Sequence, residues 1–252
     1  MGHKINVLKM LLKRANPAFK KCIRKEMINH KKVKLALIKK ESPTIIFENG
    51  FGMGMKYWDE IFLELSITNT VFTYNRNDNK NLKQHIMIDT LVEDLRSILA
   101  HKGLKTPYIL VGHSFGGLVV QYFARKYPYE VQGVILVDST HPQDFQDMST
   151  FPKKVQKQFK NFAPYFNSCG DEVLALPTYD KAPVISLVAT NKEFLKQYPQ
   201  NKPMMETMLQ KQKEFSTLYP TNELIYVESS HHIPYEKPDV VIKAIQTISK
   251  CE

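Results

Sequence analysis

Short apolar runs rich in β-branched residues alternate with longer amphipathic segments from residue 33 onward. The apolar runs predict strands at Val33–Ile38, Thr44–Phe47, Val71–Tyr74, Tyr108–Val111, Val131–Val137, Val184–Ala189 and Leu224–Val227. Helical periodicity is clearest at Met87–Ala100, where six apolar side chains share one stripe and the charged ones lie outside it. The same periodicity predicts helices at Leu118–Lys126 and Val240–Ile248. This alternation predicts the α/β fold class, with a mostly parallel central sheet of about seven or eight strands flanked by helices.

A long connection follows the strand predicted at Val131–Val137. Residues 142–182 contain a Lys-rich helical piece, Lys153–Phe162, flanked by prolines. Because this stretch is longer than an ordinary connection between strands, we expect it to form a small helical lid over an active site. The predicted organisation is a basic N-terminal segment, residues 1–32, followed by one domain, residues 33–252, that carries this insertion.

The formal net charge of +10 is concentrated near the N-terminus. Residues 1–40 contain 13 lysines and arginines and a single acid, Glu26, whereas residues 41–252 contain 22 basic and 24 acidic residues. A nearly neutral body disfavours a nucleic-acid-binding groove. One interpretation is a weak contact of residues 1–40 with an anionic membrane surface, with residues 5–14 as a short basic amphipathic helix. The preferred interpretation is a solvated basic arm or a helix packed on the domain.

The cysteines and the apolar segments indicate the cellular setting. Cys22, Cys169 and Cys251 are odd in number, far apart and without a CxxC pair, so they predict neither a disulfide framework nor a zinc site. No apolar stretch near the N-terminus is long enough to span a membrane, and no signal-peptide cleavage site follows it. We therefore expect a cytoplasmic protein. The sequence also lacks phosphate-loop, dinucleotide and HExxH motifs, so we expect no cofactor and no metal.

The motif G-x-S-x-G occurs at residues 112–116, between a predicted strand and a predicted helix. Such a turn exposes the serine hydroxyl, and it needs residues without side chains at Gly112 and Gly116 so that strand and helix can approach. The helix N-terminus also directs the amide of Phe115 toward a developing oxyanion. Ser114 is therefore the candidate nucleophile. The alternative is a glycine-rich turn that contains a serine by chance.

These features resemble the α/β-hydrolase superfamily, and the resemblance extends from about residue 33 to the C-terminus. Residues 47–52 resemble the oxyanion loop of that family, with Asn49 where a histidine is usual. The departure is tolerable because the donor in that loop is a backbone amide, which the resemblance assigns to Phe51. The alternative for this segment is a plain glycine turn.

The resemblance also implies a general base late in the chain, because a serine hydroxyl needs a neighbour that takes its proton. His231 follows the last predicted strand and fits the histidine loop of the family, with His232 as the competing residue. We expect His113, beside the nucleophile, to pack or hydrogen-bond structurally. His141 is expected at the mouth of the pocket.

The third member of the triad is a carboxylate that orients the histidine. The family's common position, just after the strand Val184–Ala189, offers only Glu193. Asp138 follows the preceding strand, where some family members carry their acid. Carboxyl ends of adjacent parallel strands share one edge of the sheet, so Asp138 is preferred to Glu193. A strand-end cap is the alternative role for Asp138.

The fold and function implied are those of an α/β-hydrolase that cleaves a small-molecule carboxylic ester through Ser114, His231 and Asp138. Other uses of the same triad are acyl transfer, thioester cleavage and peptide cleavage, and a non-catalytic ligand-binding protein on this scaffold is a further alternative. Phe51, Trp58, Tyr165 and Phe166 either shape an apolar substrate pocket or pack in the core and lid.

Overall fold

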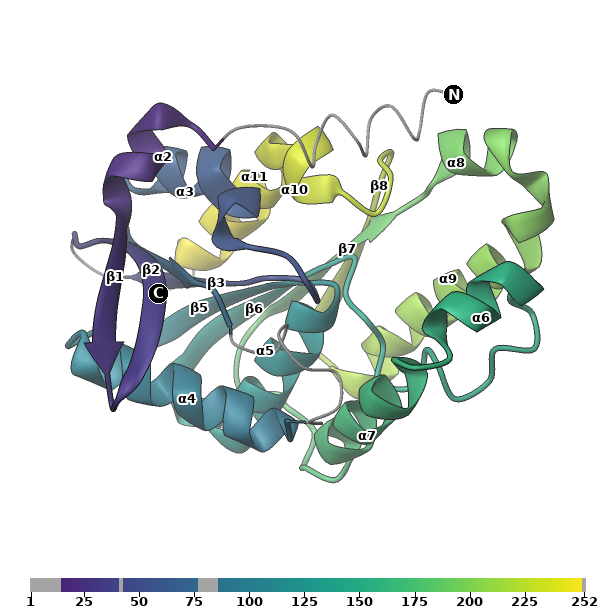
Figure 1. Ribbon diagram of the computed structural model, residues 1–252, viewed down its shortest axis with the longest axis horizontal. Coiled ribbons are helices and arrows are strands. Elements are labelled where there is room, and N and C mark those ends of the chain that lie inside the picture. Colours follow the sequence, from purple (N-terminus) through teal and green to yellow (C-terminus); the bar gives the residue numbers. More distant parts are fainter. Residues whose placement is uncertain (1–14, 41–42, 77–85, 251–252) are drawn as a thin grey trace.

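An eight-stranded sheet in the order β1-β2-β4-β3-β5-β6-β7-β8 forms the centre of the protein in the computed structural model (Figure 1). The strands are β1 (Ile23–Ile28), β2 (Lys31–Ile38), β3 (Thr44–Glu48), β4 (Thr70–Tyr74), β5 (Tyr108–His113), β6 (Val131–Val137), β7 (Val184–Ala189) and β8 (Asn222–Val227). β2 pairs antiparallel with β1 and β4, and all other pairs are parallel. The predicted fold class, a mostly parallel sheet flanked by helices, is confirmed.

The structure describes residues 15–40, 43–76 and 86–250. The helix or arm expected at residues 5–14, and Cys251, lie outside this range. No strand was expected before Val33, yet β1 pairs with β2 along its whole length, so the sheet includes residues on both sides of position 33. In the described residues no helix has the length and apolar character needed to cross a bilayer.

Helices cover both faces of the sheet (Figure 1). On one face lie α4 (Ile88–His101) and α5 (Phe115–Lys126), whose apolar stripes belong to one hydrophobic cluster. On the other face, α2 (Pro17–Cys22), α3 (Asp59–Leu65) and α11 (Pro238–Ser249) pack in a second cluster. The central strands β3 to β7 are buried along most of their length, which explains their nearly continuous apolar sequences.

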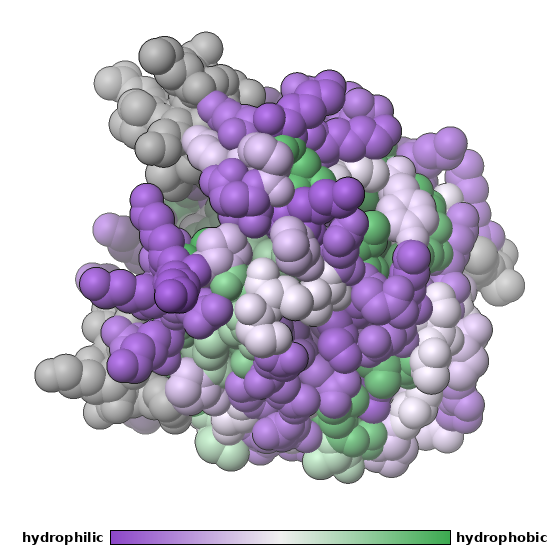
Figure 2. Space-filling model, turned by 90° about the vertical axis from the view of Figure 1, so that its right-hand side faces the viewer, coloured by the Kyte–Doolittle hydropathy of each residue, from purple (hydrophilic) through white to green (hydrophobic). Residues whose placement is uncertain are grey.

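Four helices gather at one end of the sheet: α6 (Lys153–Phe159), α7 (Ala163–Leu174), α8 (Lys192–Gln197) and α9 (Lys202–Leu218) (Figure 1). The single helical piece expected at Lys153–Phe162 ends at Phe159, and α7 starts anew with Pro164 in its first turn, where proline is tolerated. The outer surface at this end is mainly hydrophilic, with smaller hydrophobic patches (Figure 2). The short helix α10 (Ile233–Glu236) lies between β8 and α11.

Candidate active site

Ser114 lies on a sharp turn between β5 and α5, with φ 54° and ψ −124°. The left-handed φ is costly for a residue with a side chain, so the surrounding structure must enforce it. Close backbone packing does so, because a Cβ on Gly112 would lie 2.5 Å from the carbonyl oxygen of Gly116. A Cβ on Gly116 would lie 2.5 Å from the carbonyl oxygen of Glu48 in β3. The two glycines therefore let strand, helix and neighbouring loop meet at the serine.

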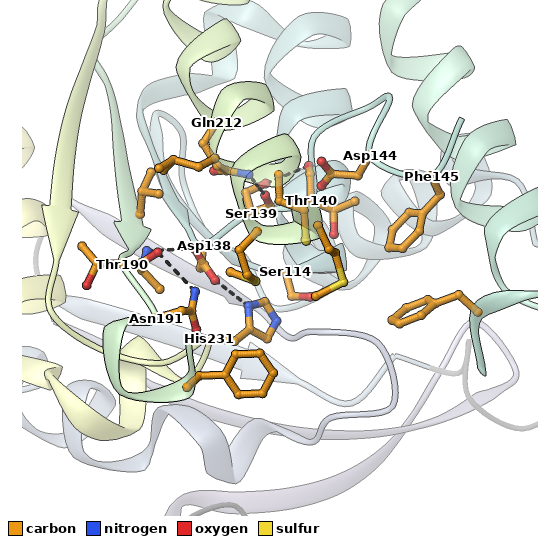
Figure 3. A pocket seen from close by; sticks show the side chains of 18 of the residues that line it. Ser114, Asp138, Ser139, Thr140, Asp144, Phe145, Thr190, Asn191, Gln212 and His231 are labelled. Atoms are coloured by element: carbon orange, nitrogen blue, oxygen red, sulfur yellow. Dashed lines mark hydrogen bonds and ion pairs between the residues drawn. The ribbon is translucent and has the colours of Figure 1, made fainter. Parts of the chain in front are cut away.

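Asp138 and His231 meet beside Ser114. Nδ1 of His231 lies 2.6 Å from Oδ2 of Asp138, while Oδ1 of Asp138 accepts a 2.9 Å hydrogen bond from the amide of Ala189. Asp138 directly follows β6, and its amide donates to the carbonyl of Leu187 in β7. In the view of Figure 3 the imidazole of His231 lies between Asp138 and Ser114. The three predicted triad residues are thus brought to one edge of the sheet.

The two competing residues lie elsewhere. Glu193 is in the first turn of α8, where its exposed carboxylate pairs with Lys196 at 2.6 Å. Nδ1 of His232 lies 3.1 Å from the hydroxyl of Tyr57. Of the two candidate acids, Asp138 is therefore the one that forms a hydrogen bond with His231. The catalytic roles of these residues stay predictions.

His113 is fully buried, and its Nε2 lies 2.8 Å from the main-chain carbonyl of His231. A carbonyl only accepts hydrogen bonds, so Nε2 carries the proton. Burial and the neighbouring His231 hold the pKa of His113 well below its usual value, so the ring is neutral. The structural hydrogen bond expected of His113 is present.

His141 does not lie at the pocket mouth, as the sequence analysis expected. Its side chain is buried, with its ring 5.2 Å from that of Phe215. Burial lowers the pKa of His141 to about 3. The expectation was wrong because the chain forms a turn at residues 141–144, where the amide of Asp144 donates to the carbonyl of His141, and Ser139, Thr140 and Asp144 line the pocket instead.

A buried arginine holds the predicted oxyanion loop after β3. Arg76 forms an ion pair with Glu48, and it donates to the carbonyls of Asn49 at 2.6 Å and Gly50 at 3.4 Å. The side chain of Asn49 donates to the carbonyl of Tyr74 at 2.6 Å. This loop is therefore held in place through the carbonyls of Asn49 and Gly50 and the side chain of Asn49. The sequence analysis did not identify Arg76, because residue 76 follows its strand without a recognisable motif.

The pocket beside Ser114 has a volume of about 510 Å³. Its wall also includes Asp138 and His231, together with six phenylalanines and four methionines: Phe51, Phe145, Phe159, Phe162, Phe166, Phe194, Met53, Met204, Met205 and Met208. Such a wall suits an apolar group, and methionines adapt to its shape. The part of the chain that the structure describes contains no group of three or more His, Cys, Asp or Glu side chains that could hold a metal ion.

The aromatic residues singled out in the sequence divide between pocket and core. Phe51 and Phe166 line the pocket. Trp58 is fully buried against Phe47, with ring centroids 5.1 Å apart, and Tyr165 packs beside Phe115. The methionines of α9 were not predicted, because the lid was expected only at residues 142–182, whereas α8 and α9 follow β7. The long connection between β7 and β8 was the feature of the sequence from which these further helices could have been predicted.

Comparisons with known proteins agree with this architecture. The chain is 29% identical over 98 residues to an uncharacterized protein of Bacillus subtilis, YqjL, and the match covers 38% of this chain and 39% of the relative. The chain thus spans about two fifths of that relative's length.

Two solved structures resemble the protein over almost its whole length. One is an epoxide hydrolase from a hot-environment metagenome, with a TM-score of 0.67 at 13% identity, covering 91% of this chain and 99% of the other. The second is mouse alpha/beta hydrolase domain-containing protein 10, with a TM-score of 0.64 at 16% identity, covering 90% and 97%. A family model described as the alpha/beta hydrolase fold matches residues 43–227, which is more than half of the chain. The chain therefore belongs to the α/β-hydrolase fold family.

Proposed function

We propose that this α/β-hydrolase is a serine esterase that cleaves small-molecule carboxylic esters with an apolar acyl group. The observation that carries the proposal is the 2.6 Å contact between Asp138 and Nδ1 of His231 in the wall of the pocket that Ser114 also lines. An ionised carboxylate only accepts hydrogen bonds, so Nδ1 bears the proton and Nε2 is left as a base. A base in this tautomer beside a serine is what nucleophilic attack on an ester requires.

In the acylation step, His231 takes the proton of Ser114 as the hydroxyl oxygen attacks the ester carbonyl. The amide of Phe115 opens α5, where a backbone N–H has no acceptor within the helix. The amide of Phe51 lies in the turn closed by the hydrogen bond from Met53 to the carbonyl of Gly50. These two amides are the proposed oxyanion donors. The protonated His231 then releases the alcohol by giving it the proton.

Deacylation repeats the same chemistry with water. His231 removes a proton from water, the hydroxide adds to the acyl carbonyl, and the proton returns to Ser114 as the carboxylic acid leaves. The aromatic and methionine wall supports an apolar acyl group, because each buried methylene gains about 0.8 kcal/mol. Asp138 keeps the imidazole in one orientation through both steps.

Epoxide opening is disfavoured, although one similar structure is that of an epoxide hydrolase. A serine that opened an epoxide would form an ether, which a histidine-activated water does not hydrolyse. An ester, in contrast, gives an acyl-enzyme that water cleaves. The presence of Ser114 at the elbow therefore supports carbonyl chemistry.

The test is intact-mass analysis after treatment with a fluorophosphonate, which reacts with activated serines, followed by hydrolysis of p-nitrophenyl esters of increasing acyl length. We expect one adduct on the wild type, none on Ser114→Ala, and one on the control Ser149→Ala, which alters an exposed serine. Ester hydrolysis should follow the same pattern and rise with acyl length.

A folded wild type without an adduct and without hydrolysis would overturn the proposal and favour a non-catalytic ligand-binding protein. Labelling of Ser114 without ester hydrolysis would point to another carbonyl substrate, such as a thioester or a peptide. Formation of a new ester when an alcohol is added would identify an acyltransferase.

A further inference from the structure

A buried carboxyl group forms part of the pocket wall and is not needed by the proposed triad. Asp144 is 5% exposed and lines the pocket, and in Figure 3 it lies beside Thr140. Its Oδ2 accepts a 2.7 Å hydrogen bond from the amide of His141. Among the described residues, its Oδ1 has no hydrogen-bond partner. A buried polar atom without a partner is costly, so an unpaired oxygen at a pocket wall points to a ligand.

The turn that carries Asp144 is held firmly against the nucleophile. The amide of Thr140 donates to the carbonyl of Ser114 at 3.1 Å. The amides of the Gln121 and Gln212 side chains donate to the carbonyls of Thr140 at 3.2 Å and Ser139 at 2.7 Å, respectively. These bonds fix residues 139 and 140, and the amide of Asp144 donates to the carbonyl of His141 at 3.0 Å, so the backbone that carries the carboxyl group is held in place. A subsite built in this way is organised before a ligand arrives.

We propose that Oδ1 of Asp144 accepts a hydrogen bond from a hydroxyl group of the substrate, which makes this carboxylate a specificity-determining residue for hydroxyl-bearing esters. The inference rests on the proposed esterase function and names the substrate class. An ammonium group would also donate to a carboxylate, but the wall around Asp144 includes Phe145 and other aromatic side chains. Bringing a full positive charge among them costs much more than bringing a hydroxyl.

The charge of Asp144 makes the preference depend on pH. Burial, together with the nearby Asp138, raises its pKa to about 7, while the amide of His141 and the positive charge of Lys211 act in the opposite direction. The carboxylate therefore predominates above pH 7, and a hydrogen bond to a charged acceptor is about twice as strong as one to a neutral acceptor. The preference for the hydroxyl-bearing ester should grow as the pH rises through 7.

The experiment compares matched esters, with and without a hydroxyl group, by titrating the acid that they release. Methyl 3-hydroxyhexanoate and methyl 6-hydroxyhexanoate are set against methyl hexanoate, and 2,3-dihydroxypropyl hexanoate is set against propyl hexanoate. The two sets distinguish a hydroxyl on the acyl side from one on the alcohol side. The quantity measured is the ratio of kcat/KM within each pair between pH 6 and pH 8. An effect of pH on the triad itself applies to both members of a pair and cancels in this ratio.

The variant is Asp144→Asn, whose amide oxygen still accepts from His141, so that its NH2 group takes the place of Oδ1. Asp147→Asn is the control, since Asp147 is an exposed carboxylate in the same loop. We expect the wild type and the control to prefer one hydroxyl-bearing ester at least tenfold at pH 8, and less at pH 6. Asp144→Asn should abolish the preference and its pH dependence, whereas Asp147→Asn should keep both.

Equal kcat/KM values within every pair for the wild type, with plain esters cleaved, would overturn the role of Asp144 and leave the esterase proposal standing. A preference that survives in Asp144→Asn would do the same. Absence of hydrolysis of all five esters would instead overturn the esterase proposal, and the inference about Asp144 with it.

Discussion

Nε2 of His113 donates a 2.8 Å hydrogen bond to the main-chain carbonyl of His231. The residue that precedes the nucleophile in sequence thus holds the loop that carries the proposed base, 118 residues away. The rings of the two histidines also lie close, with centroids 4.7 Å apart. Because His113 is fully buried and neutral, this link is a fixed part of the site.

Replacing His113 by phenylalanine should impair both stability and catalysis. The ring still fills the space, but the carbonyl of His231 loses its donor, and an unpaired buried group costs about 1–3 kcal/mol. We expect a lower free energy of unfolding and a kcat reduced about tenfold or more, with KM less affected, because the loop of His231 is no longer fixed. Urea unfolding and ester kinetics measure these effects. The control is His101→Ala at an exposed position, and unchanged kcat in His113→Phe would contradict the positioning role.

Replacing each of the two candidate acids by its amide tests which one orients His231. Asp138→Asn places an amide beside Nδ1, which favours the wrong tautomer, so kcat should fall on the order of 10³–10⁴-fold. Glu193→Gln removes only an exposed charge paired with Lys196, and kcat should change less than about twofold. Ester kinetics on both variants decide the matter. A large loss in Glu193→Gln with little loss in Asp138→Asn would reverse the assignment.

The sequence predicted the central strands because they are buried on both faces, which produces continuous apolar runs. β1 was missed for the opposite reason. Its residues Ile23–Ile28 form an edge strand with charged, exposed positions between the apolar ones, and this pattern also fits a solvated basic segment. Pairing with β2 supplies the stabilisation that the segment's own sequence does not reveal.

The candidate site was predictable where a local motif fixes the backbone, as at Ser114 between two glycines. The choice between Asp138 and Glu193 depended on which strand end lies beside His231 in space. A single sequence does not contain this information. Pocket residues such as Met204 and Asp144 were not predicted, because helix docking and a tight turn bring them to the wall. Their sequences carry no signal that distinguishes a pocket wall from ordinary packing.

Stability should fall as the pH drops from 6.5 toward 5. Burial lowers the pKa of His113 well below its usual value and that of His141 to about 3, so below pH 6.5 the unfolded chain binds a proton at each histidine and the folded chain does not. Asp144 acts in the opposite sense, because its pKa is raised to about 7 and the folded chain binds its proton first. For these three groups together, the unfolded chain binds one more proton than the folded chain. The free energy of unfolding therefore falls by about 1.4 kcal/mol for each pH unit of acidification.

Urea unfolding at pH 5, 6 and 7 measures this dependence. His141→Phe removes one of the two histidine protons and should leave a slope near zero. Asp144→Asn removes the opposing proton and should roughly double the slope. A wild-type stability that rises on acidification in this interval would contradict the assignment of neutral, buried histidines.

A methyl group at Gly116 should disrupt the site. The Cβ of Gly116→Ala would meet the carbonyl oxygens of Glu48 at 2.5 Å and Asn49 at 2.6 Å, both of them backbone atoms of the predicted oxyanion loop. We expect the loop to move and kcat to fall at least about a hundredfold, with a lower melting temperature. In the control Gly54→Ala, the nearest atom is 3.4 Å away on the side chain of Asn75, so activity should be retained. Comparable activities of the two variants would show that the loop is not held by this contact.

Removal of Arg76 should destabilise the protein far more than removal of an exposed lysine. Arg76 and Glu48 are 3% and 0% exposed, so Arg76→Met leaves a carboxylate buried without its cation, and breaking such a pair costs about 3–5 kcal/mol. Lys31 and Asp94 form an ion pair with 53% and 40% exposure, and Lys31→Met should cost less than about 1 kcal/mol. Urea unfolding compares the two. Arg76→Met should also lose ester hydrolysis where it is still folded, because the carbonyls of the predicted oxyanion loop lose their donor. Equal stability losses would mean that the buried pair contributes no more than a surface one.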